Sequence, residues 1–419
     1  MAVVNKVVIV GAGLAGATTA QALRTEGFEG TITLVGGEKH YPYIRPPLSK
    51  DFLAGRADEQ SLLPYTPAEY ADKQIELVLD ETVESIDRAS CQVTLARGGV
   101  LDYERLLLAT GASPRTLSVP DATLPGVEYL RTLEDSQRLR ASLGHSVGLC
   151  PRRVVLAGSG WIGMEVAATA RTLGAEVTVL GREKVPLEAA IGRELGAVFM
   201  QRHEEAGVSF HTDTTVVGIT ESNGRAAGFI TDTGQELPAD VIVAAVGVTP
   251  NTALAEAAGL TIQNGILTDQ SMRTSDPNIY AVGDVANAYH PFTGRHQRSE
   301  HWANAINSGR VAARAMLGQA AVLDNIPYFY TDQFDLSMEY CGYASLARNA
   351  KLILRGDPSS RKFIAFWVTP VSSSRGRVVA GMNVNVWDVQ DDFKSLITTA
   401  RAVEMEQLSD PDTPLSDLT

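Results

Sequence analysis

The sequence predicts an α/β protein with two Rossmann-like dinucleotide-binding domains and a C-terminal α+β domain. Two stretches carry the first part of this prediction, VVIVGAGLAGATTA near the start and RVVLAGSGWIGMEVA in the middle. Each runs from an apolar strand through a glycine-rich turn into an Ala-rich helix. Beyond about residue 322, aromatic residues alternate in a strand-like way in PYFYTDQF, RKFIAFWV and VNVWDV, and no phosphate loop occurs. With 419 residues, the chain is long enough for two or three domains.

Both glycine-rich turns have the G-x-G-x-x-G spacing of a dinucleotide site. The first glycine permits the turn, the second lets the backbone approach a pyrophosphate, and the third lets the helix pack on the strand. The free N–H groups of the helix start would then face the anion. A turn without a ligand is the alternative, but the strand and helix around each copy favour two nucleotide sites, at Gly11, Gly13 and Gly16 and at Gly158, Gly160 and Gly163.

The first domain is expected to begin with a strand over Lys6–Val10, a helix to about Thr25 and a strand over Thr31–Val35. An acidic residue near the end of that second strand holds ribose hydroxyls in such folds, and Glu38 is the candidate here. Further strands are expected near Glu76–Val78, Gln92–Leu95 and in YERLLLATG, which ends at Thr110 and Gly111.

The segment HYPYIRPPLSKDF contains three prolines, which should forbid a helix before Leu48 and place Lys50 at a helix start. Lysines are mostly solvated surface charges. The proline and aromatic setting of Lys50 favours a fixed position instead.

The second domain contains the second glycine turn and a strand over Glu176–Leu180, and the strand in DVIVAAVGVTPN ends it at Gly247. The chain then re-enters the first domain through a strand over Asn278–Val282, which meets Gly283 and Asp284 at a turn. We therefore expect a first domain of residues 1–113 and 248–321, a second of 114–247, a third of 322–405, and a loose acidic tail of 406–419.

Composition excludes several classes of protein. A formal net charge of −13 disfavours general binding to nucleic acid or anionic membranes. No apolar stretch is long enough to span a bilayer and no signal-peptide pattern opens the chain, so we expect a cytoplasmic protein. Cys91, Cys150 and Cys341 lie far apart without a C-x-x-C motif, and no His or Cys spacing predicts a metal site.

Seven motifs occur in the order typical of one enzyme family: GAGLAG, RPPLSK, LLLATG, YLRTLEDS, GSGWIGMEVA, GVTPN and TSDPNIYAVGD. With them the chain resembles the FAD-dependent NAD(P)H:ferredoxin reductases of the pyridine nucleotide-disulfide oxidoreductase superfamily. The resemblance covers nearly the whole chain. It implies a glutathione-reductase-like fold in which FAD binds at the first glycine turn and NADH or NADPH at the second.

The resemblance also implies roles for individual residues. At the FAD site, it implies contacts from Gly11, Gly13, Ala15, Gly16, Glu38, Lys50, Val83, Thr110, Gly111, Arg131, Gly283, Asp284 and Trp302. At the nicotinamide nucleotide site, it implies contacts from Gly158, Gly160, Trp161, Ile162, Gly163, Arg182 and Gly247.

Lys50 and Glu165 are the expected catalytic pair, which would position nicotinamide and flavin for hydride transfer. From the residues alone, Glu165 could equally complement the dipole of its helix. Trp161 stands where the family has Tyr or Val, and either covers the flavin face or packs as an ordinary aromatic side chain.

The sequence departs from the family at the end of the second nucleotide-domain strand. NADH-specific members carry an acidic residue there, whereas this chain has Gly181, followed by Arg182 and Glu183. Either Glu183 replaces the acidic residue, which favours NADH, or Arg182 binds a 2′-phosphate, which favours NADPH.

The absence of a cysteine pair in the RPPLSK segment implies that electrons leave to an external carrier, an iron–sulfur ferredoxin that supplies a cytochrome P450 or a ring-hydroxylating oxygenase. Candidates for its basic docking surface are Arg295, Arg298, Arg310 and Arg314. Two alternatives stay open: a flavin-bound signalling protein like apoptosis-inducing factor, and an NAD(P)H oxidase or quinone reductase. The resemblance is compatible with a monomer or a homodimer.

Overall fold

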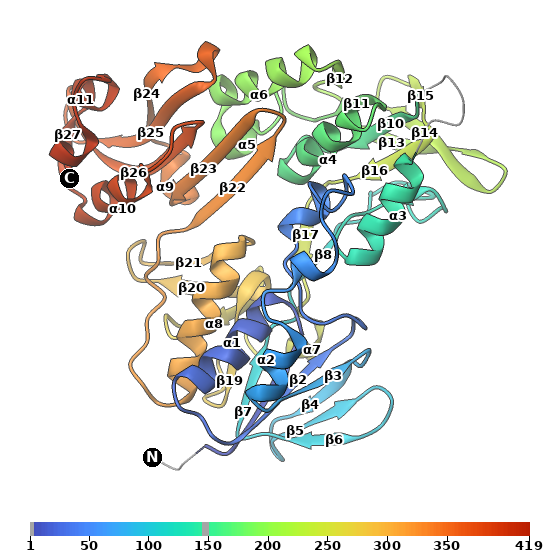
Figure 1. Ribbon diagram of the computed structural model, residues 1–419, viewed down its shortest axis with the longest axis vertical. Helices are drawn as coiled ribbons and strands as arrows, with labels where there is room; N and C mark the ends of the chain where they lie inside the picture. The colour runs from blue at the N-terminus through green and yellow to red at the C-terminus, as the bar shows by residue number, and fades with distance from the viewer. Residues whose placement is uncertain (1–3, 145–150) are drawn as a thin grey trace. The chain divides into compact units, whose positions relative to one another are not determined.

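The computed structural model describes residues 4–144 and 151–419 (Figure 1). The chain forms two compact units, and it passes between them several times. Unit 1 comprises Met1–Arg45, Asp58–Ser113 and Val248–Pro327, and unit 2 comprises Pro46–Ala57, Pro114–Gly247 and Tyr328–Thr419. Cys150 and its predicted thiol lie outside the described residues.

Unit 1 is organised around a five-stranded parallel sheet of order β19-β7-β1-β2-β3. Helix α1 packs against α8, and both contribute alanines to the core of this unit. Its elements are β1 (Lys6–Val10), α1 (Leu14–Thr25), β2 (Thr31–Gly36), α2 (Pro67–Asp72), β3 (Ile75–Leu79), β4 (Val83–Asp87), β5 (Gln92–Leu95), β6 (Val100–Asp102), β7 (Arg105–Leu108), β8 (Ala112–Pro114), β17 (Val248–Pro250), α7 (Ala253–Ala257), β18 (Ile266–Thr268), β19 (Ile279–Ala281), β20 (Ala286–His290), β21 (Arg295–Arg298) and α8 (Trp302–Met316).

The first half of unit 2 repeats this plan with a sheet of order β12-β11-β10-β16-β9, whose strands are all parallel. Its elements are β9 (Val127–Glu128), α3 (Leu133–Leu143), β10 (Arg153–Ala157), α4 (Trp161–Thr172), β11 (Glu176–Leu180), α5 (Glu188–Ile191), α6 (Arg193–Glu205), β12 (Val208–His211), β13 (Val216–Ser222), β14 (Arg225–Thr231), β15 (Glu236–Pro238) and β16 (Val241–Ala244).

The second half of unit 2 is an antiparallel sheet of order β22-β23-β26-β25-β24, to which β27 adds on β26. One hydrophobic core joins both halves, since Met164 and Phe199 share it with Met338 and Phe363. The elements are β22 (Tyr328–Gln333), β23 (Leu336–Gly342), α9 (Ala344–Ala347), β24 (Lys351–Asp357), β25 (Lys362–Pro370), β26 (Arg375–Val384), α10 (Gln390–Thr399), β27 (Ala402–Glu404) and α11 (Met405–Ser409).

Two sequence expectations are wrong. Residues 406–419 are not a loose tail, because Leu408, Leu415 and Leu418 are buried there and the guanidinium of Arg355 binds the carbonyls of Pro411 and Thr413. Lys50 does not begin a helix. A short 3₁₀ helix already covers Pro46–Ser49, because proline is tolerated in a first helical turn, and Lys50 follows it.

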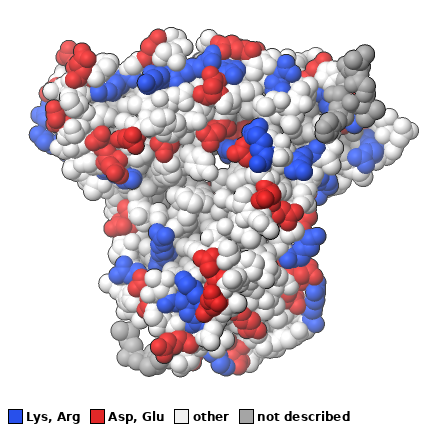
Figure 2. Space-filling model, viewed as in Figure 1, with Lys and Arg blue, Asp and Glu red and all other residues white. Residues whose placement is uncertain are grey.

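Charges of both signs are interspersed on the face drawn in Figure 2, so the net negative charge does not form a uniform acidic coat there. Within the described residues, no helix combines the length and apolar character that a membrane crossing needs.

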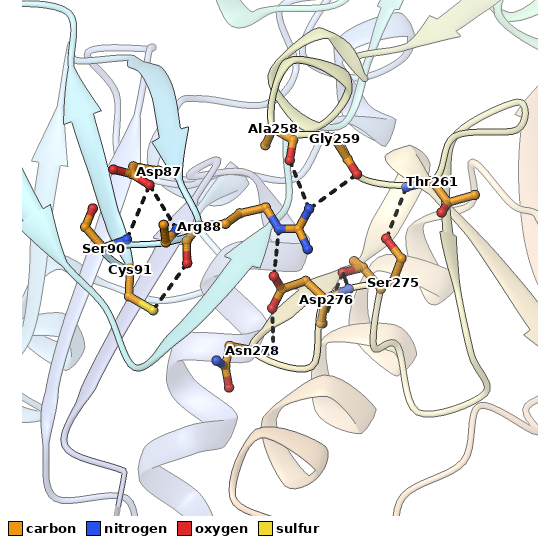
Figure 3. A network of polar contacts seen from close by, with 12 residues as sticks. Asp87, Arg88, Ser90, Cys91, Ala258, Gly259, Thr261, Ser275, Asp276 and Asn278 are labelled. Carbon is orange, nitrogen blue, oxygen red and sulfur yellow. Dashed lines mark hydrogen bonds and ion pairs between the residues drawn. The ribbon is translucent and has the colours of Figure 1, made fainter.

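Arg88 connects the β4–β5 hairpin of unit 1 to the segment that leads into β19 (Figure 3). Its Nε donates to Asp276 at 2.7 Å, and its Nη1 donates to the carbonyls of Ala258 and Gly259, which follow α7. Asp276 also accepts from the N–H of Asn278. This network fixes the chain immediately before the strand that delivers Gly283 and Asp284.

Candidate functional site

The first glycine turn has the geometry of a pyrophosphate cradle. Gly11 adopts φ +115°, and a Cβ on it would lie 2.2 Å from the carbonyl oxygen of Ala109. A Cβ on Gly16 would lie 2.1 Å from the oxygen of Gly11. Gly13 begins the 12-residue helix α1 without side-chain capping, and a Cβ there would meet no atom within 4 Å. The uncapped N–H groups of the helix start and the open approach at Gly13 fit a bound phosphate group.

Predicted residues from two other segments meet this turn. Ala109, which precedes Thr110 and Gly111, donates its N–H to Val10 at 2.8 Å. A Cβ on Gly283 would lie 3.0 Å from that of Ala15, which places the turn before Asp284 against α1. The structure thus brings together the predicted residues of the LLLATG and AVGD motifs around the first glycine turn.

Glu38 follows β2 and holds two partners. Its carboxylate accepts from the Tyr43 hydroxyl at 2.5 Å and from the Arg45 guanidinium at 2.6 Å. A carboxylate offers about four lone-pair sites, so two partners leave room for ribose hydroxyls. The carbonyl of Glu38 also accepts from the N–H of Asp80 at 3.0 Å, which brings the segment before Val83 alongside it.

Arg45 is a candidate for this site that the sequence reasoning missed. Burial lowers its pKa, but the charges of Tyr43, Glu38 and Asp284 outweigh burial and raise it overall. Arg45 is therefore a permanent cation close to both Glu38 and Asp284, beside the first glycine turn. The available signal was the Arg of RPPLSK, which was interpreted only through its neighbouring prolines.

His301 is a second residue that the sequence reasoning missed. It precedes α8, and burial lowers its pKa to about 4 although the charge of Asp284 acts in the opposite direction. The imidazole is therefore neutral at pH 7. The next residue, Trp302, starts α8 and is 39% exposed.

The second glycine turn repeats the geometry of the first. Gly158 adopts φ +113°, and its Cβ would lie 2.3 Å from the oxygen of Ala245. A Cβ on Gly163 would lie 2.1 Å from the oxygen of Gly158, and one on Gly160 would face open space. No side chain caps α4, and Ile162 in its first turn is 46% exposed. This turn also fits a bound phosphate group.

Glu183 stands near the turn, whereas Arg182 does not contact it. A Cβ on Gly181 would lie 2.5 Å from the Ser159 hydroxyl oxygen, so Ser159 explains why the usual acidic position is glycine. The Glu183 carboxylate lies 3.5 Å from the same hydroxyl. Arg182 is exposed and makes no ion pair within the described part of the chain.

Lys50 and Glu165 form a buried ion pair in unit 2. Lys50 Nζ lies 2.7 Å from Glu165 Oε2, and the two side chains are 13% and 5% exposed. Glu165 also accepts from the hydroxyls of Ser49 at 2.5 Å and Thr331 at 2.6 Å. The predicted pairing is therefore present, together with two hydroxyl donors that the sequence did not reveal.

Comparisons with known proteins agree with this geometry. Residues 5–309 match the family described as pyridine nucleotide-disulphide oxidoreductase, and residues 328–419 match the reductase C-terminal family. The chain belongs to the pyridine nucleotide-disulphide oxidoreductase family.

Within this family, the chain is similar to several ferredoxin reductases. The chain is 39% identical to a probable ferredoxin reductase of Castellaniella defragrans over 97% of both chains. It is 37% identical to the putidaredoxin reductase of Pseudomonas putida, over 99% of this chain and 96% of that one. It is also 37% identical to a chain in the crystal structure of the covalent putidaredoxin reductase–putidaredoxin complex, with a TM-score of 0.91 and coverage of 99% and 98%. The resemblance to ferredoxin reductases and the predicted fold class are confirmed.

Four predicted residues of this oxidoreductase have roles that the geometry leaves as predictions. Trp161 packs edge-on against Phe329, with ring centroids 5.1 Å apart, and against Phe199, so the packing role is present and the flavin-covering role stays a prediction. Arg131 precedes α3 in unit 2, and its predicted contact with FAD also stays a prediction. The place of Lys50 beside the flavin ring stays a prediction too. So does the contact of Gly247 with the nicotinamide nucleotide; Gly247 adopts φ +103° after β16.

The predicted basic surface of this oxidoreductase is smaller than expected. Arg298 is 11% exposed and pairs with Glu300 at 2.5 Å, so it is not a surface charge. Arg310 and Arg314 are exposed and one helical turn apart on α8, and Arg295 is exposed on β21. Three of the four candidate arginines therefore remain.

The cysteines that the structure describes, Cys91 and Cys341, are both free thiols. Burial raises the pKa of Cys341 to about 12, so it is not a ready nucleophile. Across residues 4–144 and 151–419, no group of three or more His, Cys, Asp or Glu side chains is arranged to hold a metal ion.

Proposed function

We propose that this protein binds FAD in unit 1, takes electrons from NADH bound in unit 2 and passes them to a small iron–sulfur ferredoxin. The ferredoxin would supply a cytochrome P450 or a ring-hydroxylating oxygenase. The observation that carries the proposal is the repeated cradle at Gly11–Gly16 and Gly158–Gly163, the second with the Lys50–Glu165 pair beside it. The near-complete overlap with ferredoxin reductases supports the choice of acceptor.

Unit 1 would hold FAD by its backbone and by charges of opposite sign. The start of α1 would bind the pyrophosphate, Arg45 would add a positive charge near it, and Glu38 would accept ribose hydroxyls. Asp284 would accept hydroxyls of the ribityl chain. When bound, FAD supplies an acceptor for a hydride and a donor of single electrons.

In unit 2, Lys50 and Glu165 would orient the nicotinamide ring that binds at the start of α4. Three groups with fixed geometry contact the Glu165 carboxylate: the Lys50 ammonium and the hydroxyls of Ser49 and Thr331. A buried charge pair whose hydrogen bonds are already made needs little rearrangement during the reaction, whereas removal of one partner leaves the other charge unpaired. The proposed role of the pair is orientation and electrostatics, not general-base chemistry.

The comparison of the two glycine turns supports NADH as the donor. Gly36 ends β2 and Gly181 directly follows the corresponding strand β11. Each lacks room for a Cβ beside the second residue of its turn, Ala12 or Ser159. The acidic residue also has the same spacing in both units: Glu38 stands two residues after Gly36, and Glu183 stands two residues after Gly181. We assign Glu183 to the ribose hydroxyls of NADH, where its charge would also repel a 2′-phosphate.

Electrons would leave through an external carrier. Cys341 is buried with a raised pKa and Cys91 is a single free thiol, which supports an acceptor other than a protein disulfide. Arg310 and Arg314 on α8 would contribute positive charge to a transient docking surface for an acidic ferredoxin.

The test is anaerobic stopped-flow reduction of the purified flavoprotein, followed by ferredoxin-dependent reduction of cytochrome c. We expect rapid loss of flavin absorbance with NADH, slower loss with NADPH, and cytochrome c reduction that requires the ferredoxin. Slow loss with both nucleotides would overturn the proposal and favour a signalling flavoprotein. Rapid reduction of quinone or oxygen without any ferredoxin would favour an oxidase or quinone reductase.

A further inference from the structure

Strand β22 of the C-terminal half of unit 2 lies along helix α4. It contacts α4 with alternate residues, because the Phe329 ring packs against Trp161 and the Thr331 hydroxyl bonds to Glu165. Two residues of a strand advance about 6.6 Å and four residues of a helix about 6.0 Å, so the two spacings match. Strand and helix are therefore in register, with the pair 329/331 facing the pair 161/165.

Thr331 supplies a hydrogen bond that no other described group replaces. Oε2 of Glu165 receives both Lys50 and Ser49, at 2.7 and 2.5 Å. Oε1 receives Thr331 alone, at 2.6 Å. Since Glu165 is 4% exposed, loss of this hydroxyl would leave one carboxylate oxygen buried without a donor. The carboxylate would then be held from one side only.

Gln333 fixes the direction of that bond. Its Nε2 donates to the Thr331 oxygen at 3.2 Å, so the single hydroxyl proton of Thr331 points to Glu165. Gln333 is fully buried, and its own Oε1 has no partner among the described residues. A buried amide that leaves its oxygen unpaired in order to donate here indicates that the position of Thr331 is under strong constraint.

We propose that Thr331, oriented by Gln333, is a positioning residue for Glu165 and through it for the Lys50 ammonium. This inference rests on the proposed role of the Lys50–Glu165 pair in orienting nicotinamide. It assigns part of the reaction geometry to the C-terminal sheet, whose strand β22 carries no residue of the nucleotide-binding motifs.

The kinetic test compares wild type with Thr331→Val, which keeps the branched shape but removes the hydroxyl, and with Thr331→Ser, which keeps the hydroxyl. The matched control is Thr231→Val, because Thr231 is 1% exposed with a bonded hydroxyl on β14 and takes no part in the site. We expect the limiting rate of flavin reduction by NADH to fall about 10- to 100-fold in Thr331→Val, with an unchanged Kd for NADH. Thr331→Ser and Thr231→Val should stay within about twofold of wild type.

The second readout does not use activity. Denaturant midpoints are measured for Thr331→Val in wild type and in the Lys50→Met/Glu165→Met background, where no carboxylate remains to be positioned. We expect a lowered midpoint in wild type and a clearly smaller decrease in the double variant, where only the Gln333 amide loses its acceptor. If Thr331→Val yields no folded flavoprotein, the comparison of Thr331→Ala with Thr331→Ser carries the same test.

Equal midpoint shifts in both backgrounds, or an unchanged limiting rate in Thr331→Val, would overturn the inference and reduce Thr331 to a packing residue. Failure of wild type to be reduced by either nucleotide would instead remove the proposed function. The denaturation cycle would still decide whether Thr331 holds Glu165.

Discussion

The two glycine turns of this protein are nearly identical in backbone and different in chemistry. Gly11 and Gly158 have φ values of +115° and +113°, and both third glycines would place a Cβ 2.1 Å from the first glycine's oxygen. Two residues after the third glycine, however, the first turn carries Thr18 and the second Glu165. Thr18 is 2% exposed and its hydroxyl has no described partner, whereas Glu165 has three. The shared backbone would bind phosphate under the proposed function, and the residue at this position determines whether the helix also carries a charged site.

The largest effect is expected when Thr18 of the first turn is replaced by glutamate, the residue of the second turn. Thr18→Glu would bury a carboxylate without a described cation beside it, and we expect a loss of about 4 kcal/mol or more in the free energy of unfolding. Denaturant titration and the flavin content of the purified protein measure the effect.

The matched control for this change is Thr18→Val, which removes a hydroxyl without a partner and should change stability by less than about 0.5 kcal/mol. A stable, flavin-loaded Thr18→Glu protein would show that the first turn tolerates the charge.

The reverse substitution, Glu165→Thr, makes the second turn resemble the first. The Lys50 ammonium, 13% exposed, would lose its carboxylate partner and keep the carbonyl of Pro46, and we expect a loss of roughly 3 kcal/mol in stability. The limiting rate of flavin reduction by NADH should fall roughly 100-fold. Adding Lys50→Met should restore part of the stability but not the rate, and a restored rate would contradict a role of the pair in the reaction.

The first unit is further expected to show a pH dependence from His301. Its pKa is about 4 in the folded protein against 6.5 when unfolded, so between these values the unfolded chain binds more protons. The contribution of neutral His301 to the free energy of unfolding should therefore be fully present above pH 6.5. It should be lost as the pH falls towards 4, by up to about 3 kcal/mol. Denaturant midpoints from pH 7 to pH 4.5 measure this loss.

The control is His301→Gln, which does not titrate and should remove this part of the pH dependence. An identical pH profile in the variant would assign the loss to other groups.

The smallest expected effect concerns Glu183, which stands two residues after Gly181. Glu183→Gln keeps the size of the side chain but removes its charge, and we expect the preference for NADH over NADPH to fall roughly 10-fold with no change in stability. The ratio of kcat/KM for the two nucleotides with ferricyanide as acceptor measures it. The matched control, Arg182→Gln, should change NADH use little, and a large loss of NADPH use there would identify Arg182 as a phosphate ligand.

Local patterns in the sequence predicted much of the fold. The strands at Lys6–Val10 and Glu176–Leu180 were predicted to the residue, and one was expected near Gln92–Leu95, because short β-branched runs end at glycine or turn residues there. The helical end of the chain was missed because Leu408, Leu415 and Leu418 are isolated among acidic and proline residues. Their burial depends on a surface that the sequence does not display.

The site was predictable where it depends on motifs and not where it depends on distant contacts. The glycines, Lys50 and Glu165 lie in recognisable motifs. Thr331 lies 166 positions from Glu165, in a strand with no motif of its own. The sequence left open whether Glu183 replaces the usual acidic residue. Gly181 occupies that position because the Ser159 side chain leaves no room for a Cβ, and this contact is visible only in three dimensions.

The same distances determine when the Glu165 site can form as the chain is synthesised. Ser49 is made 116 residues before Glu165, and Thr331 is made 166 residues after it. At the usual speed of a ribosome, Glu165 waits roughly ten to thirty seconds for its last hydrogen-bond donor. A nascent chain that ends before Tyr328 can already contain both glycine turns, but its Glu165 carboxylate lacks the donor from β22. The nucleotide cradles can therefore precede the completed ion-pair site during synthesis.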